Sequence, residues 1–531
     1  MSIKLSVFIA YWPQGQSFWV KMLPLVLLFI AAASAGPSCR YSEWDEWDQC
    51  ERSALCPRPV EKSFKTNPSA SVPNDVGRQN GIDMMALKEE LWSRPNPQRT
   101  RPNQIGAPVT CSGGYAGTYE CLNVDQQSFI NLDTLDGADG MASRANDNWG
   151  WTDPTNNREY VIMGLDDGTS FVDMTDPVNP IVLAYLPTST VASNWRDMKV
   201  VNDHAFIVSE AAGHGMQVFD LRRLRGMSGP TQTVQADAVY DRLGNVHNII
   251  SNPQSNTVFL VGATNGDQEG CLAGLHMIDV SDPTNPTFTG CFADDFYVHD
   301  AQCHQYNGPD TDYQGREVCY CYNEDQMAIV DVTDKANPTY ISTISYPGAA
   351  YTHQGWITED YTTILLDDEQ DESRSFEGNT RTYIFDVRDL DNPELRNTFY
   401  SAREAIDHNQ YILGDYTFQS NYEVGLRILR IDQANYNLEE VAFFDVDDTT
   451  PGGLVSFQGS WNNYPYFASG NIPVTSIELG LFIVRPNFTA MEAQHQSANN
   501  GYQYRTRELI SGSEDTCPAV KERRECVAPA C

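Results

Sequence analysis

Four histidines recur at comparable positions along this chain, each near the start of a short apolar segment. They are His247 in "NVHNII", His299 in "YVHDAQ", His353 in "YTHQGW" and His408 in "IDHNQY". Asp197 in "WRDMKV" falls at what we interpret as the same position of the preceding segment. Neutral imidazoles and carboxylates are ligands that Zn, Mn, Fe and Cu accept in proteins. The five side chains therefore form a candidate metal site.

Acidic residues follow these positions where the next apolar segment ends. Glu210 lies in "IVSEA", Glu324 in "YNEDQ", and Glu369 in "LLDDEQDE". A chain that runs down one strand and up the next returns to the same face, so these carboxylates are expected to approach the histidines. Glu210, Glu324 and Glu369 are therefore candidate general bases.

The segments that must position these residues repeat along the chain. A short strand that ends in Asp and runs into a turn recurs roughly every 50 residues between about residues 111 and 486. Five copies are "GTSFVDMTDPVNP", "GMQVFDLRRL", "GLHMIDVSDPTNP", "MAIVDVTDKANP" and "TYIFDVRDLDNP". Two more, "GLRILRID" and "GLFIVRP", carry Arg in place of the Asp. The pattern indicates seven repeats.

Each repeat has room for four short β-strands, which is typical of a β-propeller blade. Seven blades close into a ring without exposed sheet edges. We therefore predict an all-β fold with a seven-bladed β-propeller over residues 111–486. The segment "YECLNVDQQSFINL" (119–132) is expected to complete the last blade. A long sandwich array or a solenoid is the alternative.

In a propeller the first strand of each blade is innermost, so the histidines are expected to face a central channel. Two other roles for them stay open. Propellers with WD repeats use a His and an Asp in each blade as a structural hydrogen-bond network, and a pH-dependent ligand site is also possible. Clustering in four consecutive blades favours a site. The chain has no G-x-S-x-G or H-E-x-x-H motif, which argues against catalysis.

The start of the chain has the features of a secretory signal. The run "KMLPLVLLFIAAASAG" has an apolar core behind Lys21 and ends in small residues, which predicts a signal peptide over residues 1–35. Translation could start at Met1 or at Met22. An uncleaved anchor is the weaker alternative because the run is shorter than a membrane span. We expect a secreted, extracellular protein with no transmembrane segment in the mature chain.

Charge and cysteine content fit that compartment. The 531 residues carry a formal charge of -36, which argues against nucleic acid or anionic lipid as a partner. The 13 cysteines are expected to form disulfides, with one left over. Cys111–Cys121 and Cys271–Cys291 are two expected pairs. The odd cysteine is among Cys303, Cys319 and Cys321. Asn487 begins an Asn-Phe-Thr glycosylation sequence.

The two ends of the chain carry the other six cysteines. Residues 39–56, "CRYSEWDEWDQCERSALC", and residues 503–531 with Arg505 and Arg507 together resemble one thrombospondin type 1 repeat. The resemblance implies the pairs Cys39–Cys517, Cys50–Cys526 and Cys56–Cys531, and it places Trp44 at a C-mannosylation position. The propeller would be inserted in that module. Two unrelated tails are the alternative. Residues 57–110 are interpreted as a linker, with a short helix at 83–94 on the outside of the propeller.

The propeller region resembles the choice-of-anchor B family, which is built of LVIVD-type repeats. The resemblance rests on "NDNWGWTDPTNNREYVIMGLDDGTSFVDMTDPVNP", "WRDMKVVNDHAFIVSEAAGHGMQVFDL", "YVHDAQ", "YTHQGWITED" and "DHNQYILGDY". It implies a propeller and an extracellular location, without a defined chemistry.

Two functions follow from the sequence. The leading one is an extracellular interaction or adhesion protein, in which the propeller and the thrombospondin-like module bind protein or glycan ligands. The alternative is a secreted metal-dependent enzyme, a hydrolase or oxidoreductase, with Asp197 and the four histidines as ligands.

Overall fold

The chain forms two compact units, one of residues 61–495 and one of the two ends, 1–60 with 496–531. The structure is a computed structural model. It describes residues 40–41, 84–96, 98, 100–137, 142–294, 297–374, 378–491, 502–506, 509–511 and 521–525. The expected signal peptide and the cysteines of the two ends lie outside the described residues.

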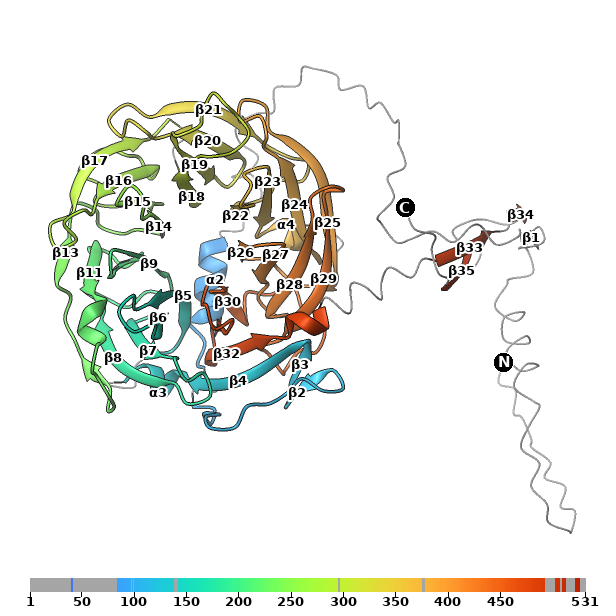
Figure 1. The fold of residues 1–531 in the computed structure, drawn as a ribbon, viewed down its shortest axis with the longest axis horizontal. Helices are drawn as coiled ribbons and strands as arrows, with labels where there is room; N and C mark the ends of the chain where they lie inside the picture. Colours follow the sequence, from blue (N-terminus) through green and yellow to red (C-terminus); the bar gives the residue numbers. More distant parts are fainter. Residues whose placement is uncertain are drawn as a thin grey trace, which may run out of the picture. The chain divides into compact units, whose positions relative to one another are not determined.

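The larger unit is a ring of seven antiparallel sheets, as predicted from the repeats (Figure 1). The first two blades in chain order are β5 (Ala145–Thr152), β6 (Glu159–Leu165), β7 (Gly168–Asp173) and β8 (Ile181–Pro187), then β9 (Arg196–Val201), β10 (His204–Ser209), β11 (Met216–Asp220) and β13 (Ala238–Tyr240). The short strand β12 (Gln232–Thr233) adds to the outer edge of β8 in parallel.

The next three blades follow the same order from the channel outward. They are β14 (Asn248–Asn252), β15 (Thr257–Val261), β16 (Leu275–Asp279) and β17 (Thr287–Phe292); β18 (Asp300–Gln305), β19 (Glu317–Tyr322), β20 (Met327–Asp331) and β21 (Thr339–Ile344); and β22 (Thr352–Ile357), β23 (Thr363–Asp368), β24 (Asn379–Asp386) and β25 (Glu394–Glu404).

The last two blades include strands from the beginning of the unit. One contains β26 (Asn409–Leu413), β27 (Tyr416–Ser420), β28 (Leu426–Asp432) and β29 (Asn437–Phe444), extended by β3 (Tyr119–Leu122) and β2 (Tyr115–Ala116). The other contains β30 (Ser460–Asn463), β31 (Ile472–Ser476), β32 (Gly480–Pro486) and β4 (Val124–Asn131). Strand β4 pairs with β32, which confirms that an N-terminal strand closes the ring.

The cores lie between neighbouring sheets, and the middle strands are buried on both faces. Strand β15 reads TVFLV, and every one of its residues is buried. Such uninterrupted β-branched and aromatic runs are expected where both faces of a strand are covered. Burying one large apolar side chain contributes about 1.5–3 kcal/mol, so these inter-blade clusters hold the ring together.

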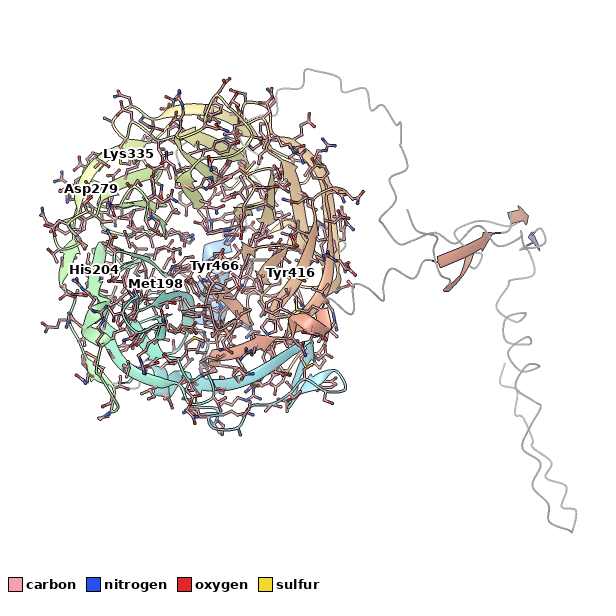
Figure 2. The ribbon with its side chains drawn as sticks, viewed as in Figure 1. Met198, His204, Asp279, Lys335, Tyr416 and Tyr466 are labelled. Atoms are coloured by element: carbon pink, nitrogen blue, oxygen red, sulfur yellow. A yellow bond between two sulfur atoms is a disulfide. The ribbon has the colours of Figure 1, made fainter. Side chains whose placement is uncertain are left out.

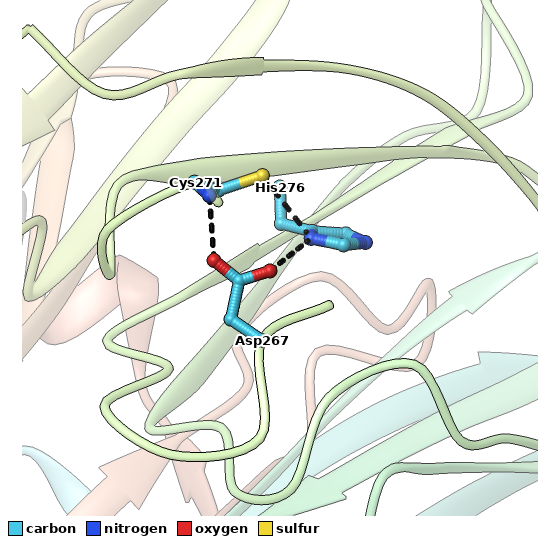
Figure 3. A group of neighbouring side chains, drawn as sticks. All are labelled: Asp267, Cys271 and His276. Carbon is cyan, nitrogen blue, oxygen red and sulfur yellow. Dashed lines mark hydrogen bonds and ion pairs between the residues drawn. The ribbon is translucent and has the colours of Figure 1, made fainter. Parts of the chain in front are cut away.

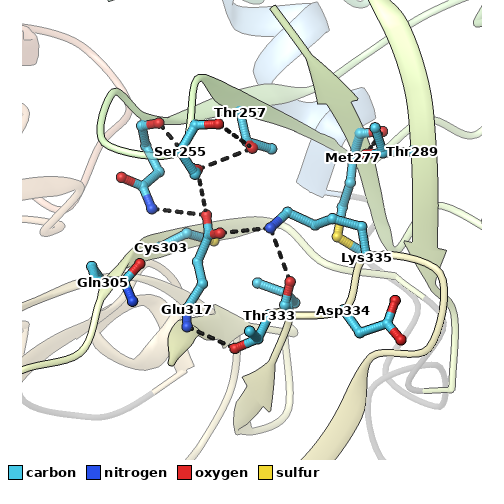
Figure 4. A network of polar contacts seen from close by, with 12 residues as sticks. Ser255, Thr257, Met277, Thr289, Cys303, Gln305, Glu317, Thr333, Asp334 and Lys335 are labelled. Atoms are coloured by element: carbon cyan, nitrogen blue, oxygen red, sulfur yellow. Dashed lines mark hydrogen bonds and ion pairs between the residues drawn. The ribbon is translucent and has the colours of Figure 1, made fainter. Parts of the chain in front are cut away.

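Polar contacts join the outer parts of neighbouring blades as well. Figure 4 shows Glu317 of β19 accepting a hydrogen bond from Ser255 of the preceding blade. Asn252 of that blade donates to the same carboxylate. Lys335 forms an ion pair with Glu317. The two blades approach so closely that a Cβ on Gly290 would lie 1.7 Å from the Lys335 carbonyl oxygen.

The helix α2 (Met84–Trp92) packs at the channel and not on the outside, contrary to the expectation from the sequence (Figure 1). Good helix formers build it, and the chain leaves the helix before Pro95. Trp92 is 4% exposed and packs on Trp195 and Trp461, with ring centroids 5.6 and 5.4 Å apart. Its indole Nε1 donates to the carbonyl oxygen of Phe457 at 3.0 Å.

Three other helical segments of the described residues are single turns: α3 (Leu132–Leu135), the 3-10 turn η1 (Leu221–Leu224) and α4 (Asp371–Arg374). Asn131 caps α3 by accepting the Thr134 N–H. None of the helices in the described part of the chain is long and apolar enough to span a bilayer.

Three disulfides fasten loops and strands of the propeller. Cys111–Cys121 closes the β2–β3 hairpin and Cys271–Cys291 joins β17 to the loop before β16, as predicted. Cys303–Cys319 links β18 to β19. Cys321 retains its thiol within buried strand β19.

The smaller unit contains strands from both ends of the chain. Strand β1 (Arg40–Tyr41) pairs antiparallel with β34 (Leu509–Ser511), and β33 (Tyr502–Thr506) pairs with β35 (Lys521–Glu525). The pairing brings the two ends into one unit. Trp44 and the six terminal cysteines lie outside the described residues, so the thrombospondin-like disulfides stay a prediction.

Candidate metal centre at the channel

The four histidines stand at the start of four consecutive innermost strands. His247, His299 and His408 directly precede β14, β18 and β26, and His353 is the second residue of β22. Their rings follow one another around the channel, with centroids 4.4, 4.2 and 4.5 Å apart in chain order. None of the four is more than 6% exposed. The structure thus brings these predicted residues together.

Hydrogen bonds fix the tautomers of three of these rings. The Nδ1–H of His247 donates to Glu210 Oε1 at 2.5 Å, that of His299 to the His353 carbonyl oxygen at 2.9 Å, and that of His408 to the Trp461 carbonyl oxygen at 2.6 Å. Carboxylate and carbonyl oxygens only accept, so each Nδ1 must carry the proton. The Nε2 atom of each ring is left with its lone pair, which is the form that binds a metal.

The Nε2 atoms of His247 and His299 lie only 2.8 Å apart. With both Nδ1 protons already donated, two lone pairs face each other across this gap. A structural network of neutral imidazoles would match donors with acceptors, and this pair does not. A cation, either a proton or a metal ion, is needed between or beside them.

Glu369 forms a second part of the site together with His353 and His408. Its carboxylate lies 3.9 Å from His353 Nε2 and 3.8 Å from His408 Nε2. One ligand atom from each of these three buried residues can be chosen so that all lie within 4.8 Å of one another. Tyr422 donates to Glu369 Oε1 at 2.6 Å, which leaves Oε2 directed toward His353. Two imidazoles and one carboxylate form a donor set of catalytic zinc sites.

Lys88 of α2 is a member of the site that the sequence did not indicate. Its ammonium group forms an ion pair with Glu369 Oε1, and both side chains are buried. The ammonium also lies 4.9 Å from the centre of the Phe457 ring, a cation–π contact. Lys88 therefore covers the carboxylate from the helix side and holds its orientation.

Burial keeps the imidazoles neutral. It lowers the pKa of His299 and His353 well below the ordinary value, and neighbouring imidazoles lower both further. Burial likewise lowers the pKa of His408 to about 4. Neutral rings at pH 7 need lose no proton to bind a metal.

We call the rings of His247, His299, His353 and His408 the imidazole group. Asp197 is not part of it. Trp195 stands directly before β9, the position that His247, His299 and His408 occupy in their own blades, and Asp197 lies two residues further along. It accepts from Lys199 at 2.6 Å and from the Ile249 N–H at 2.9 Å. We call Asp147, Asp197, Asp300 and Lys199 the lysine–aspartate group. Burial raises the pKa of Asp300 to about 7.

Aromatic side chains accompany the lysine–aspartate group. Lys199 lies 4.5 Å from the centre of the Trp149 ring. Trp149 packs on Tyr411 and on Tyr466, and Tyr466 is labelled near the centre of the ring in Figure 2. This part of the channel is therefore filled by aromatic and ion-paired groups, without histidine.

The three candidate bases occupy different positions. Glu369 lies among the possible ligands, and Glu210 holds His247 through its Nδ1–H. Glu324 is exposed, and its charge acts on Tyr351, whose ring lies 5.2 Å from that of His299. Glu210 is thus placed to orient a ligand, and Glu324 stands at the outer side of the group.

Two further groups of the described residues have metal-like spacing. Figure 3 shows Asp267, Cys271 and His276, but the Cys271 sulfur is bonded to Cys291 and is not a thiolate. Asp267 accepts the Cys271 N–H, and Tyr240 is 2.7 Å from His276 Nε2. That group is accounted for by structural contacts. The other, Asp310 with Asp389 and Asp391, is a partly exposed acidic cluster.

Comparison with known proteins identifies the repeat. The LVIVD repeat family matches residues 271–294, which contain β16 and β17. No curated protein matches the chain.

Three solved structures illustrate the similarity to other proteins. The β-propeller domain of Myceliophteria thermophila Cps50 (Swd1) is 10% identical over 62% of this chain and 93% of its own, with a TM-score of 0.41. A Lactobacillus plantarum protein is 11% identical over 73% of this chain and 97% of its own, with a TM-score of 0.39. The periplasmic gluconolactonase of Pseudomonas aeruginosa is 10% identical over 56% of this chain and 85% of its own, with a TM-score of 0.41.

Proposed function

We propose that this protein is an extracellular metal-dependent enzyme built on a β-propeller, with one transition-metal ion (Zn, Mn, Fe or Cu) at the channel. The ligands are His353, His408 and Glu369, and His299 and His247 stand beside them. The observation that carries the proposal is the buried group of His353, His408 and Glu369, whose ligand atoms all lie within 4.8 Å of one another.

The donor set supports catalysis more than a purely structural ion. Three protein ligands leave at least one position for water or substrate, whereas structural zinc sites have four protein ligands. A divalent ion there lowers the pKa of a bound water or polarises a carbonyl or phosphoryl oxygen. Lys88 and Tyr422 both hold Glu369 Oε1, so they keep Oε2 free for the ion.

Substrate would approach from the side of Glu210 and Tyr351. The Glu210 side chain is 19% exposed and Glu324 is exposed, whereas α2 covers the other side with Lys88 and Trp92. In this arrangement Glu210 orients His247, and Glu324 is the remaining candidate for moving a proton. Three disulfides in the propeller support the extracellular location.

The first experiment is elemental analysis of the purified full-length protein by plasma mass spectrometry. We expect about one transition-metal ion per chain, retained on dialysis without chelator and lost in the double variant His299→Ala with His353→Ala. The control is His204→Ala, because His204 is buried and bonds to the Asn202 carbonyl oxygen outside the site. A protein that takes up none of Zn, Mn, Fe or Cu contradicts the proposal.

A second function, ligand binding by the smaller unit, is supported by the pairing of β1 with β34. We infer an extracellular interaction or adhesion module of the thrombospondin type, made from both ends of the chain, with protein or glycan ligands. Non-reducing peptide mapping tests it: peptides from residues 39–56 must be linked to peptides from residues 517–531. Bridges confined to either end contradict the module.

A further inference from the structure

We propose that a second cation site lies beside the imidazole group and takes a hard divalent ion of the Ca²⁺ class. Its ligands are the carboxylates of Asp367, Asp371 and Asp407, with Glu372 beside them. We call these four residues the carboxylate cluster. The proposal does not depend on the transition-metal site.

The carboxylate cluster is deeply buried. Its members are between 0% and 3% exposed, and they come from the end of β23, from α4 and from the residue two before β26. Neighbouring acids are different: Asp368 accepts from the Ala350 and Tyr351 N–H groups and from the Tyr346 hydroxyl, all within 2.9 Å. Asp368 is therefore satisfied by protein donors, whereas Asp367, Asp371 and Asp407 each have at least one oxygen without a donor among the described residues.

Asp407 is the observation that points to a ligand. It is 0% exposed, and no hydrogen-bond donor of the described chain reaches either of its oxygens. Its carboxyl group faces that of Asp367 closely enough to share a proton. Burying an ionised carboxylate without donors costs several kcal/mol, so the fold keeps this pair either with a shared proton or with a cation that takes the place of the proton.

The remaining donors do not satisfy the cluster. Asp367 accepts one hydrogen bond from Gln410 at 2.7 Å, and its Oδ2 has no partner among the described residues. Asp371 Oδ2 accepts from Tyr383 at 2.6 Å and pairs with Arg381 at 3.3 Å, and its Oδ1 likewise has no partner there. Partnerless oxygens on three side chains are what an all-oxygen cation site needs.

The charge balance points the same way. Arg381 pairs with Asp371 and also interacts with the charge of Glu372, whereas Asp367 and Asp407 have no ion pair among the described residues, so these two add two uncompensated negative charges when they are ionised. A divalent ion removes most of that excess. Hard cations such as Ca²⁺ prefer oxygen ligands, whereas the imidazole group next to the cluster suits softer ions.

Binding has to draw the carboxylates together, since they are not among the groups whose ligand atoms all lie within 4.8 Å. Asp371 and Glu372 are on the short turn α4 (Asp371–Arg374). The next strand, β24, begins at Asn379. The turn can therefore adjust toward Asp407 without breaking a long element. We expect the ion to order this turn.

Terbium luminescence tests the site directly, because Tb³⁺ replaces Ca²⁺ and is sensitised by nearby tyrosine. Tyr383 donates to Asp371, so a bound ion would lie close to its ring. We expect Tb³⁺ emission, excited through tyrosine, to rise several-fold on adding the full-length protein. Ca²⁺ should reverse it with half-effect on the order of 10⁻⁴ to 10⁻³ M. No sensitised emission would overturn the proposal.

The variant Asp407→Asn separates binding from folding. We expect it to abolish both the Tb³⁺ signal and the rise in unfolding temperature on adding Ca²⁺, while its ion-free form is at least as stable as the parent. The matched control is Asp445→Asn, which also removes a buried carboxylate, 1% exposed, but far from the cluster in sequence. A Ca²⁺ response that survives in Asp407→Asn overturns the assignment.

Discussion

The imidazole group and the carboxylate cluster share two segments of chain, yet they suit opposite kinds of ion. Asp407 turns to the cluster and His408, the next residue, to the imidazoles. Strand β23 supplies Asp367 to the cluster, and Glu369, just after the end of β23, belongs to the imidazole side. Successive residues of an extended chain point to opposite sides, which accounts for the division between Asp407 and His408. Glu369 lies beyond the end of the strand, where this alternation no longer holds.

The two groups also differ in the protonation state that burial imposes on them. Burial lowers the pKa of His299, His353 and His408, which makes them neutral ligands. Burial raises the pKa of Asp367 and Asp407 well above its usual value, so in the absence of a cation they hold protons. The first group is ready for a metal at pH 7, whereas the second must exchange protons for one.

The largest effect is expected from substituting the adjacent residues Asp407 and His408 in separate variants. His408→Ala should abolish transition-metal retention and leave the Tb³⁺ signal, and Asp407→Asn should do the reverse. Both readouts are made on the same two proteins, by elemental analysis and by luminescence. Loss of both signals in either variant would mean that the two groups act as one site.

Removing the ammonium group of Lys88 sharpens the comparison on the imidazole side. Lys88→Met leaves Glu369 buried with Tyr422 as its remaining donor, which should cost about 3–5 kcal/mol of unfolding free energy in the metal-free protein. Added metal should recover part of that loss. Urea titration measures both.

The control for Lys88 is Arg222→Met, because Arg222 pairs with Asp220 but is 48% exposed. Such a surface pair contributes about 0–1 kcal/mol. Equal losses of unfolding free energy in the two variants would show that the Lys88–Glu369 pair contributes no more than an exposed ion pair.

The loss of unfolding free energy in acid should depend on His214, a buried histidine outside the imidazole group. His214 is 0% exposed and accepts from Arg196 at Nε2, and burial followed by the Arg196 charge lowers its pKa to about 4. Between pH 6.5 and about 4 the unfolded chain binds a proton at His214 that the folded protein does not. The contribution is therefore intact above pH 6.5, and about 1.4 kcal/mol is lost per pH unit below it.

The measurement is the unfolding free energy from pH 7 to pH 4.5, compared with that of His214→Gln. Gln cannot titrate, so the difference between the two curves should have this slope. Parallel curves would show that folding does not lower the pKa of His214.

The smallest effect is expected at Asp197. Asp197→Asn should leave transition-metal content unchanged, because the structure places Asp197 with Lys199 and not with the histidines. Elemental analysis beside the parent protein checks it. A fall in bound metal would return Asp197 to the ligand set predicted from the sequence.

The ring and the histidine positions could be predicted because both depend on repeated local patterns. The Asp-ending strands gave the blades, and a histidine at the start of an inner strand needs only the blade order to be placed. Asp197 was predicted at the position equivalent to the histidines, but in its blade that position is held by Trp195. A single blade has no internal signal that distinguishes these two neighbouring positions.

Lys88 and Asp407 could not be found in this way. The nine residues of α2 contain nothing that says which of their faces meets Glu369, a residue 281 positions away. Asp407 looks like the turn residue before a strand, and its lack of donors is visible only when the sheets are assembled. Both are properties of contacts between distant segments, which single-sequence patterns do not record.

The pairing of β4 with β32 has a consequence for the order in which the protein is made. Strand β4 leaves the ribosome early, but its partner comes more than three hundred residues later. Until then β4 is an unpaired edge, and the last blade and the ring stay open. Helix α2 is also synthesised before every blade it contacts, so Lys88 can reach Glu369 only as the final blades assemble. The nascent chain is therefore in need of chaperone protection until β32 has been synthesised.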